Sequence, residues 1–471
     1  MADVPSTIAE AAAWLRSGRI TSVTLTEALL ARSHATQDTL AAFITIMDEP
    51  ALAAARQADA DFAAGVDRGP LQGIPIAVKD IIATKDAPTT SNSPNMDVSW
   101  GQGRDATVVA KLRAAGAVIT GKLGLHEYAT GWPDPDTGFR IPKNPWDLTR
   151  SPGGSSSGTG AAVAGGLILG GLGTDTGGSI RGPASYCGIS GMKQTFGLVS
   201  KAGCVSLGYS LDHIGPMAKT ARDCAIMLQV LAGYDPADET SVDVPVPDML
   251  GKMDGSLAGV RVGVPREFFF TLPTLDPEVK AAVEAAIAQM QDAGATIVEV
   301  NLPHADAAWI AGRITSSSEA YTNHLPDLQT RPEKYGKYAR RSIMFGSLFS
   351  SSDYIQAQRF RSVFNAECRA VLGPQADVLV VPTMTDVAPK FADYDVGASR
   401  VSPGFMPPWN VTGLPAMSIP CGFSEAGLPI GMQVVGKAFD EPTVFKVTDA
   451  YQQLTGWHAR VPESAKEAQP A

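Results

Sequence analysis

Residues 153–191 read GGSSSGTGAAVAGGLILGGLGTDTGGSIRGPASYCGISG, and this stretch carries the strongest signal in the chain. Fourteen of its 39 residues are glycine. Glycine loses more backbone entropy on folding than any other residue, so this density requires an explanation. A flexible linker does not explain it, because residues 161–170 (AAVAGGLILG), between the two glycine-rich ends, are too apolar for a solvated chain. The pattern instead indicates a backbone that approaches a ligand closely and presents N–H groups to an anion.

The same stretch imitates a membrane span but is too short to be one. No charged residue occurs from Ser151 to Thr174, yet the apolar part, residues 161–173, is only 13 residues long. A span needs about 20 apolar residues. We therefore predict a buried helix followed by a buried strand. The N-terminal residues MADVPST lack the basic and then apolar build of a secretion signal, so we expect a cytoplasmic protein.

Helices and strands alternate elsewhere in the chain. Residues 105–115 have helical spacing of their apolar side chains and are followed by Gly116 and a short strand. The same order recurs at residues 276–300, and again at residues 354–382, where a helix leads into the apolar strand VLVVP. Apolar strands that alternate with helices predict an α/β fold, with a mixed twisted sheet covered by helices on both faces.

We expect the whole chain, residues 1–471, to form a single large domain. The segment Tyr234–Gly259 is rich in Asp and Pro and is the best linker candidate. We place the catalytic core at about residues 70–220, and we predict that residues of about 235–345 form a peripheral excursion.

Composition and charge exclude several classes of protein. Hydrophobic residues make up 44% of the 471 residues, which excludes a disordered chain. The net charge is −10, and no strongly basic stretch occurs, so we expect neither nucleic acid nor a membrane surface as a partner. None of the five cysteines lies in a CxxC pair, which argues against a disulfide scaffold and a zinc site. We expect a small-molecule substrate, no metal and no cofactor, and we allow for a homodimer.

Three short motifs match by chance. Residues 154–158 (GSSSG) fit the nucleophile elbow of α/β-hydrolases, which requires a later acid and histidine. Four histidines follow, so position alone leaves a Ser-His-Asp triad open, although none has a special setting; they are His213, His304, His324 and His458. Residues 190–193 fit S-x-x-K without its companion motifs. Residues 116–122 fall one residue short of a P-loop, because Leu123 stands where a Ser or Thr must hold magnesium.

Three longer motifs resemble those of the amidase signature enzymes. They are residues 73–80 (GIPIAVKD), 151–156 (SPGGSS) and 173–181 (GTDTGGSIR), and Ser155 and Ser179 have the family's spacing of 24 residues. The resemblance covers nearly the whole chain. It implies the amidase signature fold, a catalytic triad of Lys79, Ser155 and Ser179, and a cis peptide bond between Gly154 and Ser155.

The chemistry of the residues agrees with this resemblance. A serine hydroxyl is a poor nucleophile unless a base takes its proton, and only a neutral lysine can accept one. Burial in the apolar strand before Lys79 lowers the pKa of the lysine and so favours the neutral form. The backbone N–H groups around Thr176, Gly177 and Gly178 can form an oxyanion hole for Ser179. We expect Ser155 and Ala129 also to contact the substrate.

The leading functional interpretation is a stand-alone hydrolase of carboxamide C–N bonds, acting through a serine acyl-enzyme, with carbamates and esters as further substrates. We expect the pocket to be built from residues 89–93, 129–132, 345–349 and 405–409, whose aromatic side chains favour an apolar or aryl substrate. The alternative is the glutaminase (A) subunit of a tRNA-dependent amidotransferase. That subunit typically has a tyrosine-rich helix, and residues 354–361 (YIQAQRFR) depart from it. A third class, a nucleotide-binding or catalytically dead interaction protein, would require the intact triad to be accidental.

Overall fold

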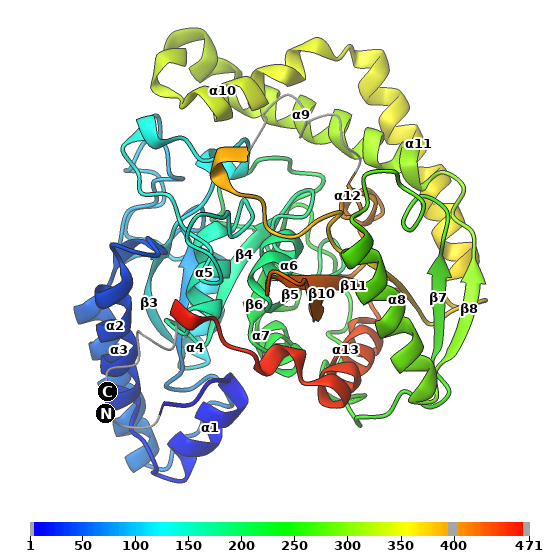
Figure 1. Ribbon diagram of the computed structural model, residues 1–471. Helices are drawn as coiled ribbons and strands as arrows, with labels where there is room; N and C mark the ends of the chain where they lie inside the picture. The colour runs from blue at the N-terminus through cyan, green and yellow to red at the C-terminus, as the bar shows by residue number, and fades with distance from the viewer. Residues whose placement is uncertain (1–3, 394–403, 465–471) are drawn as a thin grey trace.

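The computed structural model describes residues 4–393 and 404–464, which form a single α/β domain around one mixed sheet (Figure 1). In the described residues the sheet has 11 strands in the order β1-β3-β2-β4-β6-β5-β10-β11-β9-β7-β8. The strands are β1 (Phe43–Ile46), β2 (Pro75–Lys79), β3 (Val118–Leu123), β4 (Gly170–Asp175), β5 (Ser190–Lys193), β6 (His213–Ala218), β7 (Arg261–Pro265), β8 (Thr296–Val300), β9 (Val378–Pro382), β10 (Ala416–Phe423) and β11 (Pro429–Gly436). Parallel pairs join β3, β2 and β4, and also β9, β7 and β8, while the pairs between these two groups are antiparallel.

Helices cover both faces of the sheet, as predicted. The α-helices are α1 (Ile8–Arg16), α2 (Ser22–Thr36), α3 (Asp48–Ala63), α4 (Thr107–Ala114), α5 (Ser157–Ala164), α6 (Arg181–Cys187), α7 (Ala221–Leu231), α8 (Pro277–Asp292), α9 (Ala305–Thr330), α10 (Lys337–Met344), α11 (Ser351–Val371), α12 (Pro407–Val411) and α13 (Glu441–Thr455). Side chains of successive residues in a strand point to opposite faces of the sheet, so two neighbouring positions of β4 identify the helices on its two faces. A side chain at Gly170 would meet Met227 of α7, and one at Gly171 would meet Thr159 of α5.

The predicted helix and strand units are confirmed. Within the predicted unit at residues 105–115, Thr107–Ala114 form α4, which leads into β3. The predicted buried helix and strand are α5 (Ser157–Ala164) and β4 (Gly170–Asp175). Helix α8 begins after Asp276, whose side chain caps it by accepting a hydrogen bond from the Glu278 N–H at 2.7 Å.

The region predicted as a peripheral excursion is part of the main sheet. Strands β7 and β8 extend that sheet beyond β9 at one edge, and α9 packs against both α11 and α12. A loop rich in Asp and Pro marks a surface crossing without showing whether the chain then returns to the same sheet, so the sequence does not determine where this region lies. No helix in the described part of the chain is long and apolar enough to cross a membrane.

Candidate active site

Lys79 is the last residue of β2, which lies between β3 and β4, and its side chain is completely buried. Its Nζ donates hydrogen bonds to Ser155 Oγ and Thr174 Oγ1, both at 2.7 Å. All five residues of β2 are buried between β3 and β4, and this burial lowers the pKa of Lys79 to about 7. A substantial fraction of Lys79 is therefore neutral near pH 7 and able to accept a proton.

Ser155 lies in the loop that precedes α5, where the peptide bond between Gly154 and Ser155 is cis. The Ser155 carbonyl accepts a hydrogen bond from the His126 N–H at 3.1 Å. Gly154 packs directly against the His126 imidazole, because a side chain at this position would come within 2.0 Å of the ring. Glycine at position 154 is therefore required for the loop to place Ser155 beside Lys79.

Ser179 lies in the turn between β4 and α6, and Asp175 holds this turn in place. The Asp175 carboxylate accepts hydrogen bonds from the N–H groups of Gly178, at 2.8 Å, and Ile180, at 3.1 Å. The same carboxylate forms a fully buried ion pair with Arg181, in which the shortest distance is 2.9 Å. The charge of Arg181 and the hydrogen bonds to it hold the pKa of Asp175 far below its usual value, against the effect of burial.

The turn leaves N–H groups available beside Ser179. Within the described residues, the N–H groups of Gly177 and Ser179 have no acceptor, and both residues line the same cleft as Ser155. The N–H of Gly178 is already bonded to Asp175, and Gly178 does not line the cleft. Its role is to form the turn: its φ is +127°, and a side chain there would come within 2.5 Å of Met406.

A cleft of about 640 Å³ contains Ser155 and Ser179. Of the pocket segments predicted from the sequence, all of 129–132 and residues 405–407 of 405–409 line this cleft, whereas residues 89–93 and 345–349 do not. The other predicted contacts, Ala129, Thr176 and Gly177, do line it. Lining residues that the sequence analysis missed include His126, Tyr186, Trp309, Arg313 and Asp386. A signal for two of them exists in the sequence, since residues 309 and 313 share one face of a helix.

The structure separates the four later histidines from the serines. His213 is buried, with its Nδ1 2.6 Å from the Leu211 carbonyl and its Nε2 3.4 Å from Lys193. His304 pairs with Glu367, and His324 lies 3.0 Å from the Tyr335 hydroxyl. Neither these three nor His458 lines the cleft, so a Ser-His-Asp triad has no geometric support.

Lys122 and the cysteines do not line the cleft that contains Ser155 and Ser179. Lys122, in the stretch similar to a P-loop, forms a buried ion pair with Asp80 at 2.9 Å. All five cysteines are free. Within the described residues, no group of three or more His, Cys, Asp or Glu side chains is placed to bind a metal ion.

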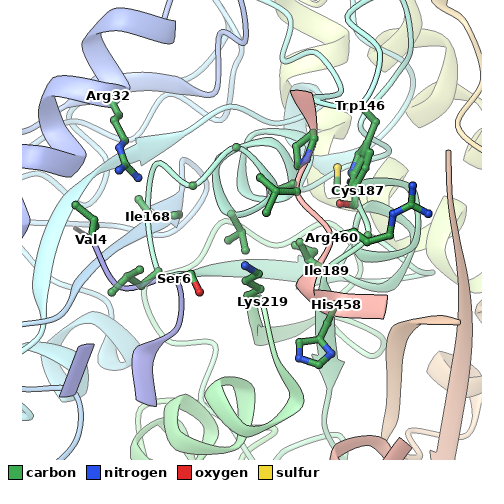
Figure 2. A pocket seen from close by; sticks show the side chains of 18 of the residues that line it. Val4, Ser6, Arg32, Trp146, Ile168, Cys187, Ile189, Lys219, His458 and Arg460 are labelled. Atoms are coloured by element: carbon green, nitrogen blue, oxygen red, sulfur yellow. Dashed lines mark hydrogen bonds between the residues drawn. The ribbon is translucent and has the colours of Figure 1, made fainter. Parts of the chain in front are cut away.

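A second cavity, of about 90 Å³, lies between the N-terminal and C-terminal segments and shares no lining residue with the cleft (Figure 2). Arg32 of α2 and Lys219, which precedes α7, both enter it. It contains none of the predicted catalytic residues, so we place the candidate active site in the larger cleft.

The pH dependence of turnover tests the role of Lys79. If its neutral amine is the base, kcat/KM will rise with pH up to a pKa of about 7 and then level off. Protonated lysine cannot accept a proton, so activity at pH 5 should be about 1% of the plateau. A profile that is flat from pH 5 to pH 8 would remove Lys79 as the base.

Comparisons with known proteins establish the family of the chain. A model of the amidase family matches residues 24–445, and the chain belongs to this family, whose members act on amide C–N bonds. The A subunit of glutamyl-tRNA(Gln) amidotransferase from Roseiflexus sp. (strain RS-1) is 43% identical, over 97% of this chain and 98% of its own length. The native peptide amidase of Stenotrophomonas maltophilia has a similar structure, with a TM-score of 0.85 and 30% identity, over 97% of this chain and 98% of that one. The A subunit of the amidotransferase from Thermotoga maritima has a TM-score of 0.81 and 33% identity, over 96% of each chain.

These relatives correct one expectation. From the sequence we expected only a small-molecule amide and no nucleic acid as partner, yet curated relatives at about 43% identity are subunits of an amidotransferase named for glutamyl-tRNA(Gln). The expectation was wrong because it rested on net charge. The charge of one chain describes its own surface and says nothing about a nucleic acid that another subunit of the same enzyme holds.

Proposed function

We propose that this chain is the glutaminase subunit of a tRNA-dependent amidotransferase, and that it releases ammonia from the side-chain carboxamide of glutamine. The observation that carries this proposal is the 43% identity to the amidotransferase A subunit over nearly the full length of both chains. Identity to the peptide amidase is lower, at 30%, over a similar share of the chain.

The proposed reaction proceeds through an acyl-enzyme on Ser179. Ser179 Oγ attacks the carboxamide carbon while its proton passes to Ser155 Oγ, and the Ser155 proton passes to the neutral Lys79 Nζ, 2.7 Å away. The N–H groups of Gly177 and Ser179 stabilise the negative oxygen that develops.

The same relay then runs in reverse. The C–N bond breaks, and the leaving nitrogen takes a proton from Ser155 as Lys79 returns one to it, so that ammonia departs. A water molecule attacks the acyl-enzyme in the same way, which yields the acid and the free Ser179 hydroxyl. No metal or redox step is needed to balance this sequence.

Hydrolysis of apolar or aryl amides is the second candidate function. It is favoured by the cleft itself, which is lined by Trp132, Tyr186, Trp309 and Phe405. Residues 354–361 support it too, since they depart from the tyrosine-rich helix of the amidotransferase protein. On this interpretation the chain is active without a partner.

Ammonia release distinguishes the two candidates. We expect the purified chain to release ammonia from L-glutamine slowly when alone, and about tenfold faster with the remaining amidotransferase subunits and glutamyl-tRNA, as measured by a coupled ammonia assay. The Ser179→Ala variant in the same mixture is the control. If the chain hydrolyses simple anilides rapidly while glutamine releases no ammonia with or without partners, the glutaminase proposal fails and the second candidate stands.

A further inference from the structure

The second cavity, of about 90 Å³, is lined by N-terminal and C-terminal segments of the chain (Figure 2). Residues 4–6, before α1, and residues 460–462 line it together with the turn that follows α5. A single water needs about 10–15 Å³ of such space, so the cavity can hold a small polyatomic ligand. It shares no lining residue with the cleft, so a ligand bound here is separate from the amide substrate.

The charged side chains that line this cavity are basic. They belong to Arg32 of α2, to Lys219 before α7 and to Arg460, and no Asp or Glu occurs among the described lining residues. The Arg460 guanidinium is exposed and lies 3.7 Å from the centroid of the Phe423 ring. In Figure 2 the side chains of Arg32 and Lys219 extend toward the cavity from different elements. The cavity therefore has a positive potential.

Arg32 and Lys219 are half-buried without a partner. Their side-chain nitrogens have no hydrogen bond and no ion pair within the described part of the chain. Burial lowers the pKa of Arg32. Burial also lowers the pKa of Lys219, although the charges of Glu10 and Asp223 oppose this shift. Those two carboxylates lie outside the cavity wall and accept hydrogen bonds from backbone N–H groups. A half-buried charge without a partner costs stability, so both cations have an unfilled requirement for an anion.

His458 adds an uncharged donor to the same wall. Burial, with the charge of Lys219 as a smaller cause, lowers the pKa of His458, so its ring is neutral near pH 7. Its Nδ1 is buried and has no hydrogen-bond partner within the described residues. The neutral ring can donate one N–H to a ligand oxygen.

We propose that this cavity binds a phosphate group, which Arg32 and Lys219 hold with the His458 ring as a further donor. The planar N–H fork of arginine matches two phosphate oxygens, and lysine supplies a compact point charge. A phosphate group carries a charge of about −1.5 to −2 at pH 7, which balances the two unpaired cations. The inference is independent of the proposed function, because none of these residues belongs to the proton relay.

The C-terminal end of α5 is a different partner for the two cations. Helix α5 ends at Ala164, which lines the cavity, and a helix C-terminus carries a partial negative charge that attracts Lys and Arg. Cations that served only this helix end would stabilise the protein without a ligand. Cations that are left unpaired until an anion binds would not. The stability of the protein without phosphate therefore distinguishes the two roles.

Calorimetry with inorganic phosphate tests the site directly, at an ionic strength held constant with sodium chloride. We expect one site per chain, with a dissociation constant that weakens at least about tenfold in Arg32→Met and in Lys219→Met. Arg56→Met, which removes an exposed cation of α3 outside the cavity, is the matched control and should bind phosphate like the unmodified enzyme. Absence of phosphate binding, or equal binding by all four proteins, would overturn the inference.

Two further ligands identify the source of the phosphate. AMP carries the group on a larger molecule, and adenosine lacks it. Binding of AMP that is lost in Lys219→Met would assign the site to the phosphate of a larger molecule, and binding of inorganic phosphate without AMP would assign it to the free ion. Equal binding of AMP and adenosine would overturn the inference, since the charged group would then contribute nothing.

Thermal unfolding gives a second readout. Phosphate at about ten times its dissociation constant should raise the Tm of the unmodified enzyme by about 2 °C and leave the Tm of Arg32→Met and Lys219→Met unchanged. Without phosphate, both variants should be at least as stable as the unmodified enzyme, because each loses an unpaired half-buried charge. A lower Tm for both variants without phosphate, with no phosphate-dependent shift in any protein, would overturn the inference and assign the cations to the end of α5.

Discussion

Ser179→Ala is expected to abolish amide hydrolysis, with kcat/KM at least about 10⁴-fold below that of the unmodified enzyme. Ser179 is the proposed nucleophile, and this variant removes the hydroxyl that forms the acyl-enzyme in the proposed reaction. The fold should be unchanged, because the turn is held by Asp175 through the N–H groups of Gly178 and Ile180 and does not use the Ser179 hydroxyl. The measurement is steady-state hydrolysis of an amide, with circular dichroism to check the fold.

Ser157→Ala is the matched control for this variant. Ser157 belongs to the same serine-rich segment and is buried, but it does not line the cleft, and its Oγ makes only a long contact of 3.5 Å with the Gly124 carbonyl. We expect its activity to stay within about threefold of the unmodified enzyme, since it loses no catalytic group and only a weak hydrogen bond. If Ser179→Ala kept more than a few per cent of activity in a preparation free of contaminants, the nucleophile would have to be another residue.

Lys79→Arg is expected to lower turnover about 10³- to 10⁴-fold, although it keeps the positive charge. Arginine stays protonated at every pH at which the enzyme can be assayed, so it cannot accept the proton from Ser155. Lys79→Met should be impaired to a similar degree, since it removes the base and the hydrogen bonds to Ser155 and Thr174 together. The measurement is kcat across the pH range, with thermal unfolding to show that each variant is folded.

The two substitutions distinguish two possible roles of Lys79, as a base that accepts a proton and as a fixed positive charge. An arginine variant with near-normal turnover, beside an inactive methionine variant, would show that Lys79 acts only through its charge. Among the described lining residues, His126 would then be the histidine to test as the base, and not His213, whose ring nitrogens lie near Leu211 and Lys193 outside the cleft. Because Lys79 is hydrogen-bonded to Ser155, and the proposed relay continues to Ser179, the apparent pKa in such profiles describes the group of residues and not Lys79 alone.

Local patterns in the sequence were sufficient to predict helices and strands of the fold. Helix α8 with its Asp276 cap and strand β8 at residues 296–300 follow from the periodicity of their side chains and from the residues at their ends. The position of β7 and β8 in the sheet does not follow, because strand order depends on pairs such as Val262 with Val378, which lie far apart in the chain. A pattern of a few residues cannot encode which distant strand it meets.

The sequence by itself determined the elements of this protein and the glycine-rich turns around Ser155 and Ser179, because these depend on residue type and short-range spacing. The candidate roles of these serines and Lys79 came from the resemblance of three motifs to the amidase signature enzymes. Only the tertiary structure decided the surroundings that give these residues their chemistry. Thr174 reaches Lys79 from 95 positions away, His126 packs on Gly154, and α9 brings Arg313 to the cleft. The physical reason is that the pKa of Lys79 and the electrostatic potential in the cleft depend on burial and on all the charged and polar groups nearby, whatever their position in the sequence. That packing exists only once the whole sheet has formed.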